Sequence, residues 1–472
     1  MSIPRRSFVL GSLGVVGGAL AGDLVAADKD VKAKTAAKKA PAKPATPALE
    51  FPPKLPGGKI MVTDQSEAFL SPGDTLQGTV IVAKEPPKVD FMYYPGQNYE
   101  GKIWSNWGEG TASHGKYYSA VGDHDAPAGN AQAFEYDPKA KTLKSILDLK
   151  SLLKLPEGHY SPSKIHTRIE RGSDGWVYCA THRGSTNVTN DQYHYKGDWI
   201  VRANPETGKQ EIVVHAPVPK HCLPTGRIDA ERLIFYGASH PGVEKKTADG
   251  GKETGNFFAY DIRSGKMLYS GPNGPSRSMI LSRSTGKVYY SPGTAGATEG
   301  PLVSFDPAKP GEPKETGLTM GIRAATDETA DGIVYAASHS KDGSMLYEFN
   351  TKNETLKTIS PAAVGEQQYV ASLAIDPIGR YVYYVPGAHG GSERDGSPLV
   401  QYDTRRKRRK VIAFLEPFYT KQYGLTLKGT YSVAVDSTGG QVFITWNVSR
   451  GSKAWDCCGL TVVHVPESER EV

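Results

Sequence analysis

The sequence predicts an all-β protein, a seven-bladed β-propeller of four-stranded blades that is closed by an N-terminal strand. Residues 164–215 contain four short runs rich in Val, Ile, Trp and Tyr, separated by Gly-containing turns. Four antiparallel strands in about fifty residues match one propeller blade. One blade cannot bury both of its faces, so the pattern must recur. It does recur, and no long helical pattern separates the copies.

The repeat is clearest in the second and third strand of each copy. Third strands read FEYDP, IVRANP, FAYDI, VSFDP, YEFN and VQYD, with a degenerate last copy LTVVHVP. The copies are spaced by roughly 45 to 60 residues, a period that a β-sandwich does not need. Second strands carry an aromatic pair or its equivalent at Tyr117-Tyr118, Val177-Tyr178, Phe235-Tyr236, Tyr289-Tyr290, Val334-Tyr335, Tyr383-Tyr384 and Val442-Phe443.

Residues 1–27 resemble a twin-arginine export signal. Arg5-Arg6-Ser7-Phe8 precedes an apolar, Gly-rich run, and a Val-Ala-Ala site follows near Ala27. An ordinary secretory signal is the alternative interpretation. The apolar run is short for a transmembrane helix. We therefore expect a periplasmic or extracellular protein that has no transmembrane span in its mature form. We also expect it to be a monomer.

Residues 28–57 are rich in Lys, Ala and Pro and predict a disordered tether. The first 54 residues carry nine Lys or Arg against four Asp or Glu, whereas the other 418 carry 47 against 46. The basic balance of the chain thus belongs to the leader and the tether. The predicted propeller has no cationic excess, so its charge gives no case for nucleic-acid binding.

Residues 58–102 contain the closing strands, and residues 103–466 form the predicted propeller. The last blade has only three strands before the chain runs out after Val465. An added N-terminal strand would leave no open sheet edge, and Thr79–Lys84 (TVIVAK) is the segment we expect to supply it.

Titratable residues gather at two places that share one rim of the ring. Strand direction alternates within a blade, so the start of the first strand and the end of the second lie on the same face. Nine of the twelve histidines lie between His114 and His240. Second-strand ends are followed by His124, His182, His240, His339 and His389, and first strands begin with His166, Arg168, His221, Arg277, Arg323, Tyr369 and Tyr431.

First strands line the central channel of a propeller, so these side chains predict a concave ligand pocket at one mouth. The loop Arg183–Asp198 is expected to fold over it, with Tyr193 and Tyr195 against a sugar ring. One chemistry that suits these residues is β-elimination on a uronate polysaccharide. That reaction needs a cation at the carboxylate, a base for the adjacent proton and an acid at the leaving oxygen.

For this reaction we predict a catalytic group of His166, His221 and Tyr195. The predicted substrate-binding residues, which include the cations that would neutralise a carboxylate, are Arg168, His124, Tyr193, His240, Arg277 and Arg323. Two alternatives stay open. One is a divalent metal held by some of His166, His182, His221 and His240, although no pair has a tight metal-binding spacing. The other is a non-catalytic propeller that binds a glycan or a protein partner.

The runs WSNWGEG, YYSAVGDHDAPAGNA, KIHTR and THRGS resemble the propeller polysaccharide lyases, ulvan lyases most and oligogalacturonate lyases more distantly. The resemblance covers blades one to three. It implies a lyase acting on an acidic polysaccharide or oligosaccharide, with His166 and His182 as its catalytic histidines. Where a tyrosine and an arginine would follow in blade three, this chain has His221 and His240. The likeness to oligogalacturonate lyases also implies a metal held by histidines.

The chain has four cysteines. Cys179 and Cys222 are predicted to be small buried strand residues. The adjacent Cys457 and Cys458 are predicted to form a strained vicinal disulfide or to bridge elsewhere in an oxidising compartment.

Overall fold

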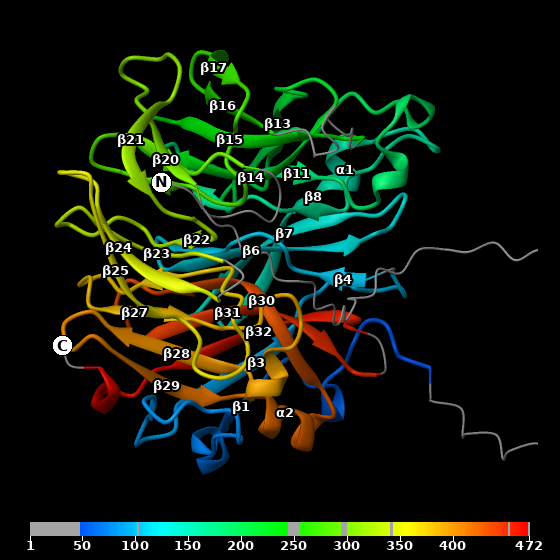
Figure 1. Ribbon diagram of the computed structural model, residues 1–472. Helices are drawn as coiled ribbons and strands as arrows, with labels where there is room; N and C mark the ends of the chain where they lie inside the picture. The colour runs from blue at the N-terminus through cyan, green and yellow to red at the C-terminus, as the bar shows by residue number, and fades with distance from the viewer. Residues whose placement is uncertain are drawn as a thin grey trace, which may run out of the picture. The chain divides into compact units, whose positions relative to one another are not determined.

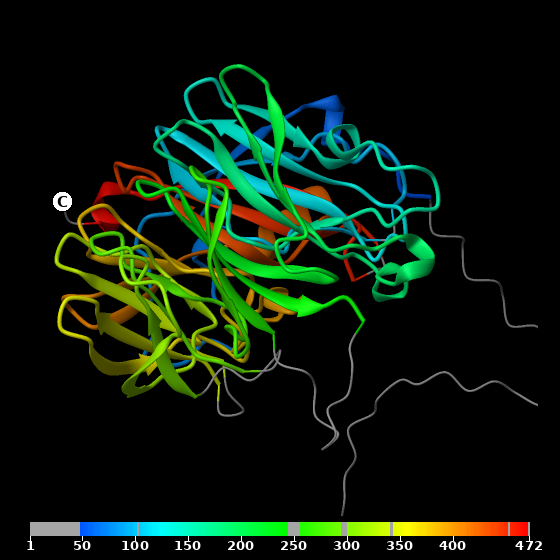
Figure 2. The same cartoon turned by 90° about the horizontal axis from the view of Figure 1, so that it is seen from above.

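A computed structural model shows a seven-bladed β-propeller within the compact unit Leu49–Val472 (Figure 1). The structure describes residues 48–101, 103–243, 255–293, 300–339, 343–451 and 454–470. The predicted export signal and most of the predicted tether lie outside these ranges. Figures 1 and 2 show the blades as separate twisted sheets, coloured from cyan in blade one to red in blade seven.

The first four blades follow the predicted order, each with consecutive antiparallel strands. Blade one contains β4 (Ile103–Ser105), β5 (Thr111–Ser113), β6 (Lys116–His124), β7 (Ala131–Asp137) and β8 (Thr142–Asp148). Blade two contains β9 (Lys164–Ile165), β10 (Glu170–Arg171), β11 (Val177–His182), β12 (Trp199–Ala203) and β13 (Gln210–His215). Blade three contains β14 (His221–Asp229), β15 (Ile234–Pro241), β16 (Asn256–Asp261) and β17 (Lys266–Gly271), and blade four β18 (Ile280–Leu281), β19 (Val288–Tyr290), β20 (Pro301–Phe305) and β21 (Lys314–Thr319).

The last three blades continue this pattern. Blade five contains β22 (Ala324–Ala325), β23 (Ile333–Ala337), β24 (Met345–Asn350) and β25 (Thr355–Pro361), and blade six β26 (Ala374–Ile375), β27 (Tyr381–Tyr384), β28 (Pro398–Asp403) and β29 (Arg408–Phe414). Blade seven contains β30 (Thr426–Val435), β31 (Gln441–Ser449) and β32 (Cys457–His464). The described helices are α1 (Leu149–Leu153), α2 (Glu416–Tyr423) and the 3-10 turns Pro56–Gly58, Glu67–Leu70, Thr186–Val188, Asp191–Tyr193, Ser392–Asp395 and Glu467–Glu469. None of the helices in these ranges is long and apolar enough to span a bilayer.

The seventh blade is completed by β3 (Lys88–Tyr93), which pairs antiparallel with β32. The prediction that Thr79–Lys84 would do this is wrong. Within that segment β2 (Ile81–Val82) runs parallel to β29 at the edge of blade six. The longer β3 buries Val89 and Phe91 completely, whereas Ile81 is 39% exposed, so more apolar area is removed from water by the observed pairing. β1 (Val62–Gln65) then covers the outer edge of β3.

The closure is tightly packed at Gly459, which lies opposite Tyr93 in the β3–β32 pair. A Cβ atom at this position would lie 2.6 Å from two ring carbons of Phe91. We expect Gly459→Ala to lower the free energy of unfolding by about 1–3 kcal/mol, as overpacking a buried site does. Gly78→Ala is the matched control, because its Cβ would meet no atom within 4 Å. Equal urea midpoints for the two variants would contradict this packing.

The predicted second-strand aromatic residues pack between neighbouring blades. Tyr117 stacks on Phe443 with ring centroids 5.1 Å apart, and Tyr289 meets Phe349 edge-on at 4.9 Å. All three tyrosine pairs, at 117–118, 289–290 and 383–384, are essentially unexposed. These contacts explain why a large planar residue recurs at this point of the repeat.

All four cysteines are buried free thiols. Cys457 and Cys458 are consecutive residues of β32, and their side chains enter different cores. Successive side chains of a strand point to opposite faces, so a vicinal disulfide would require the strand to be broken here. The predicted bridge at this pair is therefore wrong, whereas the prediction of buried thiols at Cys179 and Cys222 is confirmed.

Candidate functional site

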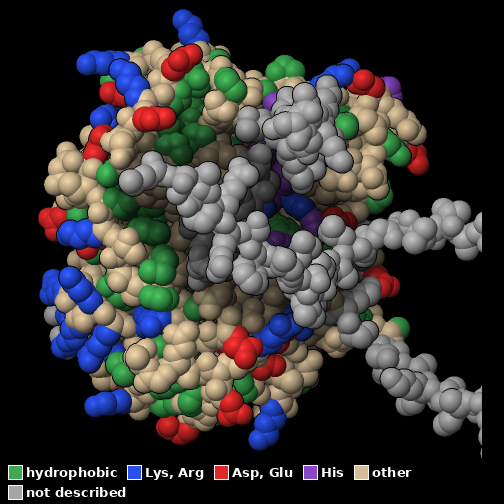
Figure 3. Space-filling view, viewed as in Figure 1, with side chains coloured by type: hydrophobic (Ala, Val, Ile, Leu, Met, Phe, Trp, Pro, Cys, Tyr) green, Lys and Arg blue, Asp and Glu red, His purple; other side chains and the backbone are tan. Residues whose placement is uncertain are grey.

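The aromatic rings of four blades meet at one mouth of the channel, around Trp107. The Trp107 ring centroid lies 4.7 Å from that of His124 and 6.1 Å from that of His166. It also lies 5.4 Å from His389 and 4.9 Å from Tyr431. We call this mouth the funnel and define it by Trp107, His124, Lys164, His166, His182, Arg277, Arg323, Tyr369, His389 and Tyr431. Figure 3 shows histidine and basic side chains gathered in a hollow near the middle of this face.

His166 and His182 are paired by the local strand geometry. Lys164 lies opposite His182 in the β9–β11 ladder, and His166 follows two residues later on the same side of the chain. The two imidazole centroids are 5.1 Å apart. His166 Nδ1 donates to the Pro224 carbonyl at 2.5 Å, and a carbonyl only accepts, so Nδ1 carries the proton and Nε2 keeps a free lone pair.

The histidines of the funnel are neutral bases. Burial, followed by the charges of Lys164 and Arg277, holds the pKa of His166 well below its usual range. Burial and then His166 lower the pKa of His182, whose Nδ1 has no hydrogen-bond partner among the described residues. Burial lowers the pKa of His124 to about 3. The pKa of His389 is lowered as well, first by burial and then by the charge of Arg323. At neutral pH these rings are therefore unprotonated, and each keeps a nitrogen lone pair.

Four arginines line one cavity with His166, and two of them, Arg277 and Arg323, form no ion pair with a carboxylate of the described residues. Trp107 and Tyr431 also line this cavity. Arg323 donates to the hydroxyl of Tyr369 and lies over the rings of Tyr369 and Tyr431, at 4.8 and 5.6 Å. Burial and the neighbouring Arg323 lower the pKa of Arg277. Within the described ranges no carboxylate forms an ion pair with either group, so the cavity presents positive charge that an anionic ligand can neutralise.

Lys164 adds a third cation at the rim. Its Nζ lies 4.8 Å from the centroid of the Trp107 ring, a cation–π arrangement. Burial lowers its pKa to about 8, although the nearby Asp125 opposes that shift. Lys164 is therefore charged at neutral pH and begins to lose its proton in mildly alkaline solution.

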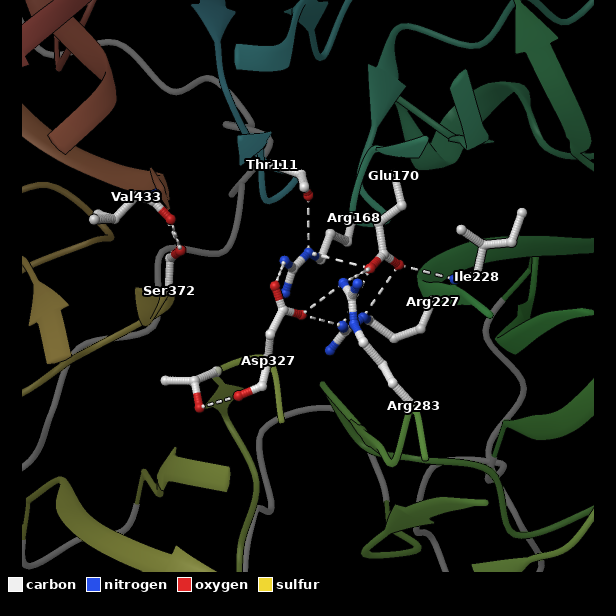
Figure 4. A network of polar contacts seen from close by, with 10 residues as sticks. Thr111, Arg168, Glu170, Arg227, Ile228, Arg283, Asp327, Ser372 and Val433 are labelled. Carbon is white, nitrogen blue, oxygen red and sulfur yellow. Dashed lines mark hydrogen bonds and ion pairs between the residues drawn. The ribbon is translucent and has the colours of Figure 1, made fainter. Parts of the chain in front are cut away.

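Below the funnel, an ion-pair network closes the channel (Figure 4). Arg168 donates to Asp327 at 2.8 Å and to Thr111 at 3.0 Å. Arg227 donates to Glu170 at 3.1 Å and to Asp327 at 2.9 Å. Arg168 lines the cavity with His166, but its guanidinium is paired with carboxylates of the protein, so the substrate-binding role of Arg168 stays a prediction. It lies two residues beyond His166, in the run between β9 and β10.

Tyr195 lies in the core of blade two and not in the funnel. Its side chain is 1% exposed, its hydroxyl donates to Asp198 at 3.3 Å, and its ring packs edge-on against Tyr160. The catalytic role predicted for Tyr195 does not fit this position. Tyr193 lies half-buried against the same core, so the loop Arg183–Asp198 packs on its own blade at both tyrosines.

We expect Tyr195→Phe to lower the free energy of unfolding by about 1 kcal/mol, the usual net worth of one buried hydrogen bond. Asp198 would keep its bonds from Tyr160 and Thr181, at 2.8 and 2.6 Å. Urea unfolding monitored by fluorescence measures this change. A loss of ligand binding or turnover at unchanged stability would contradict the structural role and restore Tyr195 to the site.

His221 and His240 lie at the blade-three side of the same face. His221 Nδ1 is 2.9 Å from the Ser239 hydroxyl, and His240 lies opposite Cys222 in the β14–β15 ladder. The charge of His240 contributes to lowering the pKa of His182, which places the two rings near each other. In the part of the chain that the structure describes, no three His, Cys, Asp or Glu side chains are arranged to hold a metal ion. The predicted histidine set therefore does not fit a metal centre.

A larger cavity of about 800 Å³ opens at the opposite mouth and includes His114 and His464 in its lining. Its carboxylates already have partners within the protein: Asp376 accepts from the backbone of Arg380 and Tyr381, Asp436 from that of Gln441, Asp327 from Arg168 and Arg227, and Glu328 from Ser282 and Ser284. Size alone favours this cavity, but the neutral bases and unpaired guanidiniums lie in the funnel. The funnel is therefore the candidate site.

Several funnel residues were absent from the predicted site. Tyr369 and Tyr431 were recognised as first-strand starts but given no role, and Lys164 alternates with His166 on one strand. Trp107 lies in the run WSNWGEG, before β5 of blade one. The signal that could have found them is the period of two along the first strands, which places alternate side chains in the channel.

No protein-family model matches the chain, and no curated protein sequence matches it. Among solved structures, an oligogalacturonate lyase in complex with manganese matches with a TM-score of 0.51 at 8% identity, over 85% of this chain and 99% of that chain. A Xanthomonas campestris gluconolactonase matches with a TM-score of 0.40 at 10% identity, over 89% of this chain and 98% of that one. At 8% identity the likeness to the oligogalacturonate lyase shows the propeller fold alone, and it gives no sequence-level support for the ulvan-lyase resemblance.

Proposed function

We propose that this chain is an exported polysaccharide lyase that cleaves a uronate-containing polysaccharide by β-elimination in the funnel. One observation carries the proposal: the neutral His166 and the unpaired Arg277 and Arg323 line one cavity. A base and a carboxylate-binding cation at the same place are what removal of a proton next to a carboxylate requires.

The arginines would hold the uronate carboxylate. Removing the adjacent proton leaves a carbanion-like state in which negative charge spreads onto the carboxylate, and two guanidiniums stabilise that state more than the ground state. Guanidinium groups also match the planar geometry of a carboxylate. Arg323 is held in place by Tyr369 and by the Ala371 carbonyl, so its orientation is set before the ligand arrives.

The proton would move to His166. Its Nε2 takes the proton from the carbon beside the carboxylate, the electron pair forms a carbon–carbon double bond, and the bond to the leaving sugar oxygen breaks. That oxygen needs a proton. Tyr431, whose pKa is raised by burial, keeps its hydroxyl proton in the resting site and is the donor we assign. No step uses a metal.

The test is incubation of the purified protein with a panel of uronate polysaccharides, monitored by the ultraviolet absorbance of the unsaturated product. Growing absorbance with at least one substrate is the expected result. Glycan binding with no absorbance change on any member of the panel would replace the lyase with a non-catalytic glycan-binding propeller. Export through a twin-arginine-type signal is tested separately, by locating the mature protein in cell fractions after replacing Arg5 and Arg6 with Lys.

A further inference from the structure

Glu109 is a channel carboxyl group that the proposed reaction does not use. It lies in the irregular run between β4 and β5, and three contacts fix that run. Asn106 donates to the Gly108 carbonyl at 3.0 Å, the Ile169 amide donates to the Glu109 carbonyl at 2.9 Å, and the Gly110 amide donates to Ser432 at 2.7 Å. The backbone of Glu109 is thus tied to blades one, two and seven.

The glycines on either side allow this close approach. A Cβ at Gly108 would lie 2.5 Å from the Thr167 carbonyl oxygen, and one at Gly110 would lie 2.6 Å from that of Tyr118. Both obstacles are backbone atoms that cannot move aside. Glu109 therefore sits on a backbone segment held between blades, and it lines the funnel cavity as well as the smaller cavity below it.

The charges around Glu109 are unequal. Four arginines line the funnel cavity with it, and two of them, Arg168 and Arg227, are paired with Glu170 and Asp327. The other two, Arg277 and Arg323, have no such partner in the described structure. Glu109 is the carboxyl group that lines this cavity with them, and its charge, after Tyr369 and Tyr431, contributes to raising the pKa of Arg323. An acidic ligand would bring a second negative charge into the same small space.

We propose that Glu109 is a specificity-determining residue of the funnel: an acidic sugar binds there together with one proton, which Glu109 takes up. The inference rests on the proposed function for the class of ligand. Ionised Glu109 repels a uronate carboxylate and protonated Glu109 does not, so the affinity for uronates rises as the pH falls through the pKa of Glu109. A neutral sugar would show no such dependence.

The other groups that face Glu109 keep their charge between about pH 5 and 7, so a change in uronate affinity in this range would come from Glu109. Burial raises its pKa, against the charges of Arg168, Arg227 and Arg323. Glu170 and Asp327 have lowered pKa values and stay ionised, and His166 stays neutral. Lys164, at the rim, titrates only near 8. From blades six and seven the cavities are lined by Ala371, Leu373, Ala374, Ile375, Tyr431, Val433, Ala434 and Val435, of which only Tyr431 can titrate.

The experiment is titration calorimetry of the whole protein with methyl glucuronide, which has no sugar on its 4-hydroxyl and so cannot be cleaved. Proton uptake is obtained by repeating each titration in buffers of different ionisation enthalpy at pH 5, 6 and 7. We expect uptake of up to one proton per ligand and an affinity about five- to tenfold higher at pH 5 than at pH 7. The methyl ester of the same sugar, which is neutral, should show neither effect.

The variant Glu109→Gln should bind methyl glucuronide at pH 7 as tightly as the wild type does at pH 5, without proton uptake. Glu348→Gln is the control and should behave as wild type, because Glu348 is a half-buried carboxylate that pairs with the exposed Lys357 and does not line the funnel cavity. Equal proton uptake in wild type and Glu109→Gln, or uptake with the methyl ester, would overturn the inference alone. Absence of binding in both proteins would overturn it together with the proposed ligand class. If Glu109→Gln does not fold, the acid–ester comparison in the wild type decides.

Discussion

Glu170→Gln should lower the free energy of unfolding by about 3–5 kcal/mol, the cost of leaving a buried charge without its partner. Glu170 is 2% exposed and accepts from Arg227 at 3.1 and 3.2 Å and from the Ile228 amide at 2.8 Å. The neutral amide keeps the shape of the side chain but leaves Arg168, Arg227 and Arg283 with Asp327 as their main carboxylate. Three guanidiniums would then repel one another in the middle of the ring.

The matched control is Glu348→Gln, which removes the same charge from an exposed pair and should cost less than about 1 kcal/mol. Urea unfolding at pH 7 measures both variants. The two should differ clearly in midpoint, and equal midpoints would contradict the idea that the network stabilises the channel. A second check is ionic strength, because salt should weaken the exposed pair and leave the buried network little affected.

The effect of Glu170→Gln should also depend on pH. The neighbouring arginines hold the pKa values of Glu170 and Asp327 below their usual ranges, against the opposing effect of burial. A carboxyl with a lowered pKa in the folded state stabilises the fold above its unfolded pKa, near 4, and loses that contribution as the pH falls through the folded value. The stability difference between wild type and Glu170→Gln should therefore be full at pH 7 and should shrink below about pH 4.

His166→Gln should lower the rate of elimination by at least a hundredfold, the usual contribution of a general base, with little change in stability. The base acts in its neutral form, and its pKa is held below the ordinary value by burial and nearby cations. The acid limb of the wild-type pH–rate profile should therefore lie below pH 6.5, and this limb should be missing from the residual activity of the variant.

His159→Gln is the control, because His159 stacks on His194 and is not a member of the funnel. It should leave the rate and the pH profile unchanged. A wild-type rate for His166→Gln would remove His166 from the reaction, and the next candidate would be His182, which lies within 5.1 Å of it. A lowered rate with an unchanged acid limb would mean that His166 positions the substrate without taking the proton.

The sevenfold fold could be predicted because each blade repeats the same turn glycines and second-strand aromatics, and seven weak local signals reinforce one another. The closing strand could not. Thr79–Lys84 and Lys88–Tyr93 are both short β-type runs, and only the three-dimensional pairing shows that Val89 and Phe91 fill the last core. The local sequence pattern does not show which of two neighbouring strand-like runs pairs with the open edge of the last blade.

The sequence was enough to predict where the site lies, but not which residues form it. Strand direction was enough to bring His124, His166 and His182 to one mouth. Residue type does not reveal the partner that a side chain finds. Arg168 is paired with Asp327, which lies three blades further along the ring, and Tyr195 donates to Asp198 in its own loop. No sequence pattern distinguishes these two carboxylates from the others in the chain.

The pairing of β3 with β32 joins residue 88 to residue 464. During synthesis, the first partner leaves the ribosome long before the second exists, so the ring stays open until the final residues emerge. If the leader acts as an export signal, as we propose, the export machinery can receive a folded domain only after β32 has been synthesised. A frameshift or early stop just before codon 457, which removes β32, should consequently remove the protein from the exported pool, even though every funnel residue would still be encoded.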